Sequence, residues 1–334
     1  MDAIDISVVI PVYNSAAMLP ALHSRLHAVL VSTGKSFEVV YVDDGSNDGS
    51  WEVLAGLHAN DRNHVVAIQL MRNFGQHNAL MCGFRRARGA YIVTMDDDLQ
   101  HPPEELPKML AAIEGTDLDL VYGQYEQKQH GAAKNLASRV VNRFYRIVFQ
   151  SPVTVTSFRI LRRELLETIH SYSLNFTFID GLLAWNTRRI GEVRVAHHLR
   201  AAGRSGYRLG KLLTLALNLF TNFSLLPLQL VSFCGMTAAV TGLVLGVYYL
   251  VQHLAGSITV PGYASTIVSI LVLGGLQLLG LGIIGEYVGR LHLNVNRKPQ
   301  YSVRHIMSAE TAPPKGDSSE RYPHDSRAAG TRAA

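Results

Sequence analysis

Three consecutive carboxylates stand in the first third of the chain, at Asp96, Asp97 and Asp98. They follow the apolar run 90–95, which is typical of a buried strand, and precede residues 99–105, which open a helix. Carboxylates at the carboxyl end of a strand lie where open α/β sheets bind ligands. Like charges this close repel one another, and Mg²⁺ prefers carboxylate oxygens. The cluster therefore indicates a metal site for a phosphate-bearing substrate, although an isolated acidic triplet is also typical of a solvated turn.

Two further polar loops are expected on the same edge of the sheet. Residues 11–14 follow the first predicted strand and residues 43–49 follow the second. A carboxylate there can accept the imide proton of uracil or the ribose hydroxyls, and Tyr13 can stack on a base. Turn formation explains Asp, Asn and Gly in any single loop equally well, but their joint placement favours a binding crevice. The glycine fingerprints of dinucleotide-binding turns and P-loops are absent, which counts against dehydrogenases and NTPases.

The elements that must position these loops follow a regular alternation. Apolar runs predict strands at Ile6–Val12, Phe37–Val42, Val65–Leu70, Tyr91–Met95 and Leu120–Tyr122, and helical patterns fit between them at Met18–Val31, Ser50–Ala59, Gln76–Arg86 and Glu104–Glu114. This βαβ order predicts an α/β fold with a mostly parallel sheet and helices on both faces.

The second half of the chain contains a long uncharged stretch. No Asp, Glu, Lys or Arg occurs from Leu212 to Gly285. Two spans, about 228–250 and 265–284, match the roughly 20 apolar residues that a bilayer core requires. The outer flanks are basic and the short turn between the spans is not, so the positive-inside rule places both termini in the cytoplasm. A buried helical hairpin in a soluble core is the alternative.

Excess positive charge gives the chain a formal net charge of +5. Such a balance can indicate a nucleic-acid partner. Here much of the excess lies beside the predicted spans, where it would face anionic lipid headgroups. We therefore expect a membrane surface and no nucleic acid.

Four motifs follow one another along the chain, namely Val9–Asn14, Val42–Ser46, Arg72–His77 and Asp96–Glu104. Together they resemble the family 2 glycosyltransferases of the GT-A fold, and more narrowly the polyprenyl-phosphate glycosyltransferases. That group includes dolichyl-phosphate mannose synthases, bactoprenol glucosyltransferases and undecaprenyl-phosphate 4-deoxy-4-formamido-L-arabinose transferases. The last of these is the most similar, because Arg72–His77 and Val195–His198 followed by Gly203–Tyr207 match its pattern. The segment Gly285–Arg290 resembles members with a two-helix membrane hairpin.

The resemblance implies the activity and the partners. It implies inverting transfer of a sugar from a nucleotide sugar, expected to be uridine-linked, to undecaprenyl or another polyprenyl phosphate. The enzyme would work on the cytoplasmic face of a bacterial inner membrane as a multi-pass protein and form homo-oligomers. Gly242 and Gly246 have the spacing that permits close packing of membrane helices.

The resemblance also implies residue roles. Asp96 and Asp98 correspond to the outer aspartates of the family's D-x-D motif and would hold the catalytic Mg²⁺ or Mn²⁺, with Asp98 as the direct ligand. The nucleotide would be held by Pro11, Tyr13, Asp43 or Asp44, Gln76 and Asp97. The lipid phosphate would be gripped by Arg139, Arg143, Arg200 and Arg204, since arginine suits phosphate geometry. Each of these arginines could instead be an interfacial charge.

The resemblance and the hydropathy and composition of the chain together set the domain boundaries. We expect a GT-A catalytic domain at 1–208, an interfacial helix at 209–226, a two-span hairpin at 227–289 and a cytoplasmic tail at 290–334 that is disordered from about 308. Within the catalytic domain, residues 134–150 form a basic amphipathic pattern that suits either a membrane interface or an ordinary surface helix.

Three positions depart from the family pattern. Ser15 stands where the family usually has Glu, residues 153–159 lack the carboxylate expected before Phe-Arg, and Gly206 replaces a lysine. A lipid monophosphate has a second pKa near 6 and is already a good nucleophile near neutral pH, so a carboxylate base is dispensable. A catalytically degenerate scaffold remains an alternative. A processive polysaccharide synthase is a weaker one, because its Gln-x-x-Arg-Trp motif is absent.

Overall fold

The computed structural model describes residues 4–125, 155–174, 177–196, 226–255, 262–296 and 298–309. Its centre is an eight-stranded sheet with the order β7-β5-β6-β4-β1-β2-β3-β8. The strands are β1 (Ile6–Val12), β2 (Phe37–Asp43), β3 (Val65–Leu70), β4 (Tyr91–Thr94), β5 (Leu120–Tyr125), β6 (Arg159–Arg162), β7 (Ile190–Val195) and β8 (Val303–Met307). The helices are α1 (Leu19–Ser32), α2 (Ser50–Asn60), α3 (Gln76–Phe84), the 3-10 turn η1 (Pro103–Glu105), α4 (Leu106–Glu114), α6 (Arg163–His170), α7 (Ile179–Asn186), α9 (Leu226–Leu254) and α10 (Tyr263–Val295).

Both faces of the sheet are covered by helices. Along β1, Val8 and Ile10 point to one face, where α1, α2 and α4 pack, while Val9 points to the other, where α3, α6 and α7 pack. Strands buried on both faces explain the continuous apolar runs in the sequence. The predicted α/β architecture is confirmed, with helices on both faces of the sheet.

The central strands run parallel. β1 pairs in parallel with β2 and β4, and β2 pairs in parallel with β3. The carboxyl ends of β1, β2 and β4 therefore meet at one edge of the sheet. β6 is antiparallel to both β4 and β5, a mixed region that the simple βαβ pattern did not predict.

The last strand of the sheet comes from beyond the apolar hairpin. β8 pairs antiparallel with β3 and covers its outer edge. The sequence predicts a tail at 290–334 and no strand within it, because the five residues of β8 include two basic side chains and give only a weak strand pattern. The 1–208 segment therefore does not contain the whole sheet.

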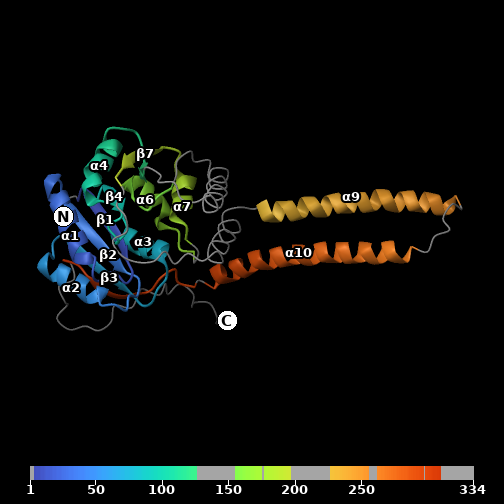
Figure 1. Cartoon of the computed structure of the whole chain (residues 1–334), viewed down its shortest axis with the longest axis horizontal. Helices are drawn as coiled ribbons and strands as arrows, with labels where there is room; N and C mark the ends of the chain where they lie inside the picture. The colour runs from blue at the N-terminus through green and yellow to red at the C-terminus, as the bar shows by residue number, and fades with distance from the viewer. Residues whose placement is uncertain are drawn as a thin grey trace, which may run out of the picture.

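The two long apolar helices lie side by side and extend away from the sheet domain (Figure 1). α9 and α10 each contain an 18-residue window that is long and apolar enough to cross a membrane, at Val231–Tyr248 and Val272–Gly289. Apolar side chains along them are exposed, including Phe233, Met236 and Leu278. The predicted helical hairpin is confirmed as a pair of helices, with each helix extending past the predicted span.

Candidate active site

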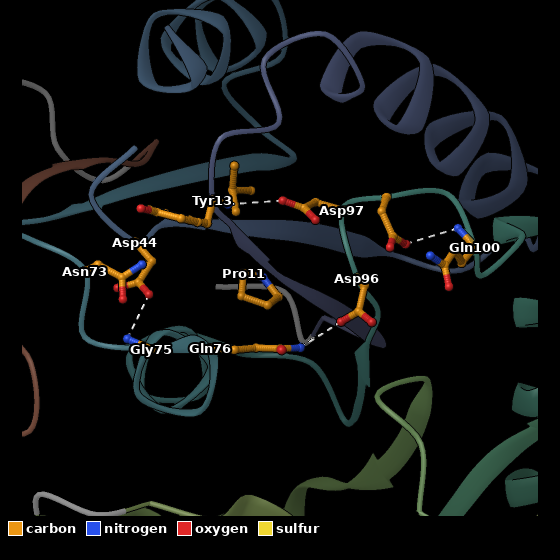
Figure 2. Close-up of a pocket in the computed structure, with 11 residues that line it drawn as sticks. Pro11, Tyr13, Asp44, Asn73, Gly75, Gln76, Asp96, Asp97 and Gln100 are labelled. Carbon is orange, nitrogen blue, oxygen red and sulfur yellow. Dashed lines mark hydrogen bonds between the residues drawn. The ribbon is translucent and has the colours of Figure 1, made fainter. Parts of the chain in front are cut away.

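A pocket of about 700 Å³ lies at the carboxyl ends of β1, β2 and β4 (Figure 2). This is the edge at which the sequence placed the three polar loops, and the volume falls in the range typical of small-molecule sites. Its walls are formed by Pro11, Val12, Tyr13, Asp44, Asn73, Gly75, Gln76, Asp96, Asp97, Asp98 and Gln100.

The loops after β1 and β2 are tied together by hydrogen bonds. Asn14 adopts a left-handed backbone conformation with φ 53°, which asparagine tolerates better than most residues. Its backbone N–H donates to Ser46 Oγ at 2.9 Å, and its side-chain Oδ1 accepts from the backbone N–H of Asn47 at 2.9 Å. These bonds fix the loop that presents Tyr13, whose side chain is about half exposed at the pocket wall.

Asp97 is held by the loop after β1. Its Oδ2 accepts hydrogen bonds from the backbone N–H of Tyr13 at 3.1 Å and from Ser15 Oγ at 2.5 Å. Burial raises the pKa of Asp97 to about 6, and the neighbouring charges of Asp96 and Asp98 act in the same direction. Ser15, which departs from the family pattern, thus connects the first loop to the acidic cluster.

Asp96 is held from two other elements. Its Oδ1 accepts from Gln76 Nε2 at 2.7 Å, as Figure 2 shows, and its Oδ2 accepts from Ser157 Oγ at 2.6 Å. Gln76 is the first residue of α3, and Ser157 precedes β6. The hydroxyl of Ser157 comes from the segment in which the family carboxylate is missing.

Asp98 begins a tight turn. Its Oδ1 accepts from the backbone N–H of Gln100 at 3.2 Å, and Leu99 between them has a φ of 58°. A left-handed conformation is unfavourable for leucine and is found mainly where the surroundings enforce it, often at functional sites. The turn keeps Asp98 on the pocket side of the chain.

The two aspartates after β2 have different positions. Asp44 lines the pocket, and its two oxygens accept from the backbone N–H groups of Phe74 at 2.7 Å and Gly75 at 2.8 Å. Burial raises its pKa to about 6, against the effect of these bonds. Asp43 is fully buried, accepts from the backbone N–H of Ser46, and is not among the residues that line the pocket. The structure therefore favours Asp44 over Asp43 as the residue that a ligand can reach.

The charged residues that line the pocket are acidic. Its lining contains Asp44, Asp96, Asp97 and Asp98, and within the described part of the chain it contains no lysine or arginine. Carboxylates this close in a partly buried site disfavour ionisation unless positive charge is nearby. An anionic ligand would be repelled unless a cation enters with it. The oxygen donors are those that Mg²⁺ and Mn²⁺ prefer, so the residues present fit such an ion.

The structure brings most of the sequence-predicted residues together. Pro11, Tyr13, Asp44, Gln76, Asp96, Asp97 and Asp98 all line one pocket. The predicted phosphate ligands Arg139, Arg143, Arg200 and Arg204, like the amphipathic segment 134–150, lie outside the described residues.

Sequence reasoning missed several residues of the site. Asn73, Gly75 and Gln100 line the pocket, and Ser157 orients Asp96. Asn73 and Gly75 fall inside the motif 72–77, so their place in that motif was an available signal. Ser157 lies in the stretch 153–159 where the family carboxylate is missing, but the antiparallel placement of β6 beside β4, which brings it to Asp96, was not predicted.

Comparison with known proteins agrees with this geometry. Residues 7–170 match the family described as "Glycosyl transferase family 2". The chain is 36% identical over 313 residues to the undecaprenyl-phosphate 4-deoxy-4-formamido-L-arabinose transferase of Pseudomonas aeruginosa (strain LESB58), covering 91% of each protein. It is 34% identical to the transferase of the same name from Aeromonas hydrophila, covering 92% of this chain and 95% of the relative.

The chain belongs to glycosyltransferase family 2. Among solved structures, this glycosyltransferase is similar to glucosyl-3-phosphoglycerate synthase from Mycobacterium tuberculosis in complex with Mn²⁺, UDP and phosphoglyceric acid. The TM-score is 0.51 at 18% identity, covering 65% of this chain and 78% of that one. The complex with Mn²⁺, UDP and glucosyl-3-phosphoglycerate gives a TM-score of 0.50 at 17% identity, covering 66% and 80%. These likenesses show a shared fold.

Proposed function

We propose that this glycosyltransferase transfers a sugar from a uridine-linked nucleotide sugar to undecaprenyl or another polyprenyl phosphate, with inversion at the anomeric carbon and with Mg²⁺ or Mn²⁺. The acceptor is supported by relatives whose names specify undecaprenyl phosphate. The nucleotide and the metal are supported by the structures of glucosyl-3-phosphoglycerate synthase in complex with UDP and Mn²⁺.

The observation that carries the proposal is the lining of the pocket. Among the described residues it contains four aspartates and no lysine or arginine. A nucleotide diphosphate brings further negative charge, so binding next to Asp96 and Asp98 requires a divalent cation that both can contact. The bound ion would screen the diphosphate and stabilise it as a leaving group. Asp96, Asp98 and the turn around Leu99 supply oxygens for that role.

The remaining residues would position the donor. Tyr13 offers a half-exposed ring on which the base can stack, and Pro11 and Gln76 line the same pocket. Asp44 fixes the turn at Phe74 and Gly75, which forms the wall of the pocket across from Asp96 (Figure 2). The lipid phosphate oxygen attacks the anomeric carbon, the bond from that carbon to the diphosphate oxygen breaks, and the nucleotide diphosphate leaves. An ionised phosphate needs no base, so alignment of the two reactants is the main task of the protein.

The hairpin of α9 and α10 would anchor this site to the membrane. Exposed apolar side chains over these helices are stable only in an apolar environment. We place both termini in the cytoplasm, because basic residues flank the hairpin on its outer sides. A homo-oligomer is also part of the proposal, since Gly242 and Gly246 leave open space on α9 where another helix can approach.

The test is a lipid-product assay. Purified full-length protein is incubated with undecaprenyl phosphate, Mg²⁺ or Mn²⁺ and a panel of nucleotide sugars, and the lipids are analysed by mass spectrometry. One glycosyl-phospholipid should form and should disappear with a chelator. Asp98→Ala should abolish it in a protein that still folds, and full activity of that variant would refute the metal assignment. A folded wild-type protein that neither binds nor turns over any donor would instead favour a scaffold.

A further inference from the structure

A second group of metal-ligating side chains lies at the sheet edge opposite the active-site pocket. His27 is on α1, and Asp61 and His64 lie in the connection from α2 to β3. This connection enters β3 at its amino end, whereas the active-site pocket lies at the carboxyl ends of the parallel strands. The group therefore shares no residue with the active-site pocket.

The distances within this group suit a metal ion. One ligand atom from each residue can be chosen so that all lie within 4.8 Å of one another. His27 Nε2 is 3.4 Å from Asp61 Oδ2, and His64 Nδ1 is 2.8 Å from Asp61 Oδ1. Ligands bound tetrahedrally at about 2.0–2.1 Å are roughly 3.3–3.4 Å apart. The His27–Asp61 separation already has that value, and the ligand atoms of the three residues are at most 4.8 Å apart, so His64 would have to move toward a shared ion.

The carboxylate has an oxygen available for a ligand. Asp61 Oδ2 is buried as an atom and accepts no hydrogen bond within the described part of the chain. The other oxygen accepts from the backbone N–H of His64 at 3.3 Å, and the Asp61 carbonyl accepts from Val65 at 3.0 Å. The turn thus fixes the carboxylate with one oxygen aimed at His27. His27 Nε2 lies 3.4 Å from this oxygen, which is long for a hydrogen bond, so the oxygen can accept a closer ligand.

The two imidazole rings are held in place by one aromatic side chain. Phe37 stacks on His64 with ring centroids 4.5 Å apart, and it meets His27 edge-on at 5.6 Å. Phe37 contacts both rings and restricts their orientations, although the side chains of His27 and His64 are 39% and 41% exposed. Such preorganisation is typical of metal sites. A capped turn explains the contact of His64 with Asp61, and an ion pair between protonated His27 and Asp61 is the alternative to a metal at the second oxygen. The metal titration below distinguishes the two.

We propose that His27, Asp61 and His64 bind a transition-metal dication such as Zn²⁺, with water completing the coordination. Imidazole nitrogens favour Zn²⁺, Co²⁺ and Ni²⁺ over Mg²⁺, whereas the oxygen-only cluster at Asp96–Asp98 has the opposite preference. The metal joins α1 to the start of β3 and stabilises the folded domain, since a ligand that binds only the native state raises its stability. The site does not depend on the proposed transferase activity.

The test is a metal titration of tag-free, full-length protein in detergent. The Asp98→Asn variant, in which the predicted active-site ligand is removed, should still bind one equivalent of Zn²⁺ in calorimetry. It should also give a visible Co²⁺ absorption band of tetrahedral type. Added to Asp98→Asn, His27→Gln and His64→Gln should each abolish the saturable Zn²⁺ binding and the band, while His170→Gln, on helix α6, should leave both in place in the same background.

Folding is checked by the melting temperature of each variant without metal. Zn²⁺ should raise the melting temperature of Asp98→Asn and of the variant that also carries His170→Gln, and should leave that of the variant that also carries His27→Gln unchanged. Absence of saturable binding in Asp98→Asn would overturn the proposal. Equal binding by the His27 and His64 variants would overturn it as well.

Discussion

At the scale of single residues, hydroxyl groups position the acidic cluster. Ser157 donates to Asp96 and Ser15 donates to Asp97, in each case at 2.6 Å or less. Hydrogen bonds to a charged group are stronger than those between neutral groups. Two positions that depart from the family pattern therefore contribute to the geometry of the site.

Removal of the Ser157 hydroxyl should impair catalysis without unfolding the protein. The lost bond to a carboxylate corresponds to about 1.5–3 kcal/mol, so Ser157→Ala should lower kcat/KM by about 10–100-fold. The neighbouring Thr156→Ala is the matched control, because Thr156 bonds only to the carbonyls of Gly123 and Phe158. Equal kinetics for the two variants would show that Ser157 does not position Asp96.

Asp44 should give the stability of the protein a characteristic pH dependence. Its pKa is about 6 when folded, mainly because of burial, and 3.8 in the reference state. The folded protein then binds the Asp44 proton more tightly than the unfolded chain does. The contribution of this proton to the free energy of unfolding is therefore fully present below pH about 4 and is lost as pH rises through 6. Asp44→Asn should become more stable relative to wild type over that window, by at most about 3 kcal/mol.

The measurement is the difference in melting temperature between variant and wild type, followed across the same pH range. Asp48→Asn is the control with the opposite sign. Hydrogen bonds from Ser50 and Ala16 outweigh its partial burial and lower the Asp48 pKa. Asp48→Asn should therefore lose stability relative to wild type only as pH rises through values near and below the reference pKa of 3.8, and from about pH 5 to 6 its difference from wild type should be flat. A flat difference for Asp44→Asn would contradict the burial argument.

At the scale of elements, β8 links the end of the apolar hairpin to the active-site loop. The backbone N–H of Met71 donates to the carbonyl of Ser302 at 2.9 Å, directly before the 72–75 segment that forms a pocket wall. Upstream of β8, Gln300 is buried against Thr177 and Tyr301 accepts from Arg85 at 3.1 Å. The strand thus covers an edge and restrains a wall of the pocket.

Truncation after residue 299 should lower the melting temperature and raise the KM for the donor, because β3 loses β8 on its outer edge and the 72–75 loop loses its restraint. Truncation after residue 309 keeps β8 and should behave like the full chain. Thermal melting and donor kinetics of both proteins give the comparison. An unchanged donor KM in the shorter protein would show that β8 does not support the pocket.

At the scale of the whole molecule, the proposed membrane anchorage would place the sheet domain in water and the apolar helices in lipid. α9 has 29 residues and α10 has 33, which correspond to about 44 and 50 Å of helix. A bilayer core is about 30 Å thick, so each helix can cross it with residues to spare. The active-site pocket would then lie in the water phase beside the membrane, where a lipid phosphate can reach it.

The proposed topology can be tested with single cysteines in a variant that lacks Cys82 and Cys234. A cysteine at Ser257, between the two helices, should react with an impermeant maleimide in intact spheroplasts. Ser32→Cys, on the sheet domain, should react only after lysis. The opposite pattern would indicate that the termini lie outside the cytoplasm. Labelling of both positions in intact spheroplasts would exclude a hairpin across the membrane.

The central sheet, the two apolar helices and most of the pocket could be predicted from local patterns in the chain. Local signals suffice there: continuous apolar runs bury strands such as 6–12 and 65–70 on both faces, and the carboxyl ends of parallel strands must share an edge. Only the tertiary structure decided which of Asp43 and Asp44 faces the pocket, that Ser157 holds Asp96, and that β8 completes the sheet. These features depend on contacts between residues far apart in the chain, which no local pattern encodes.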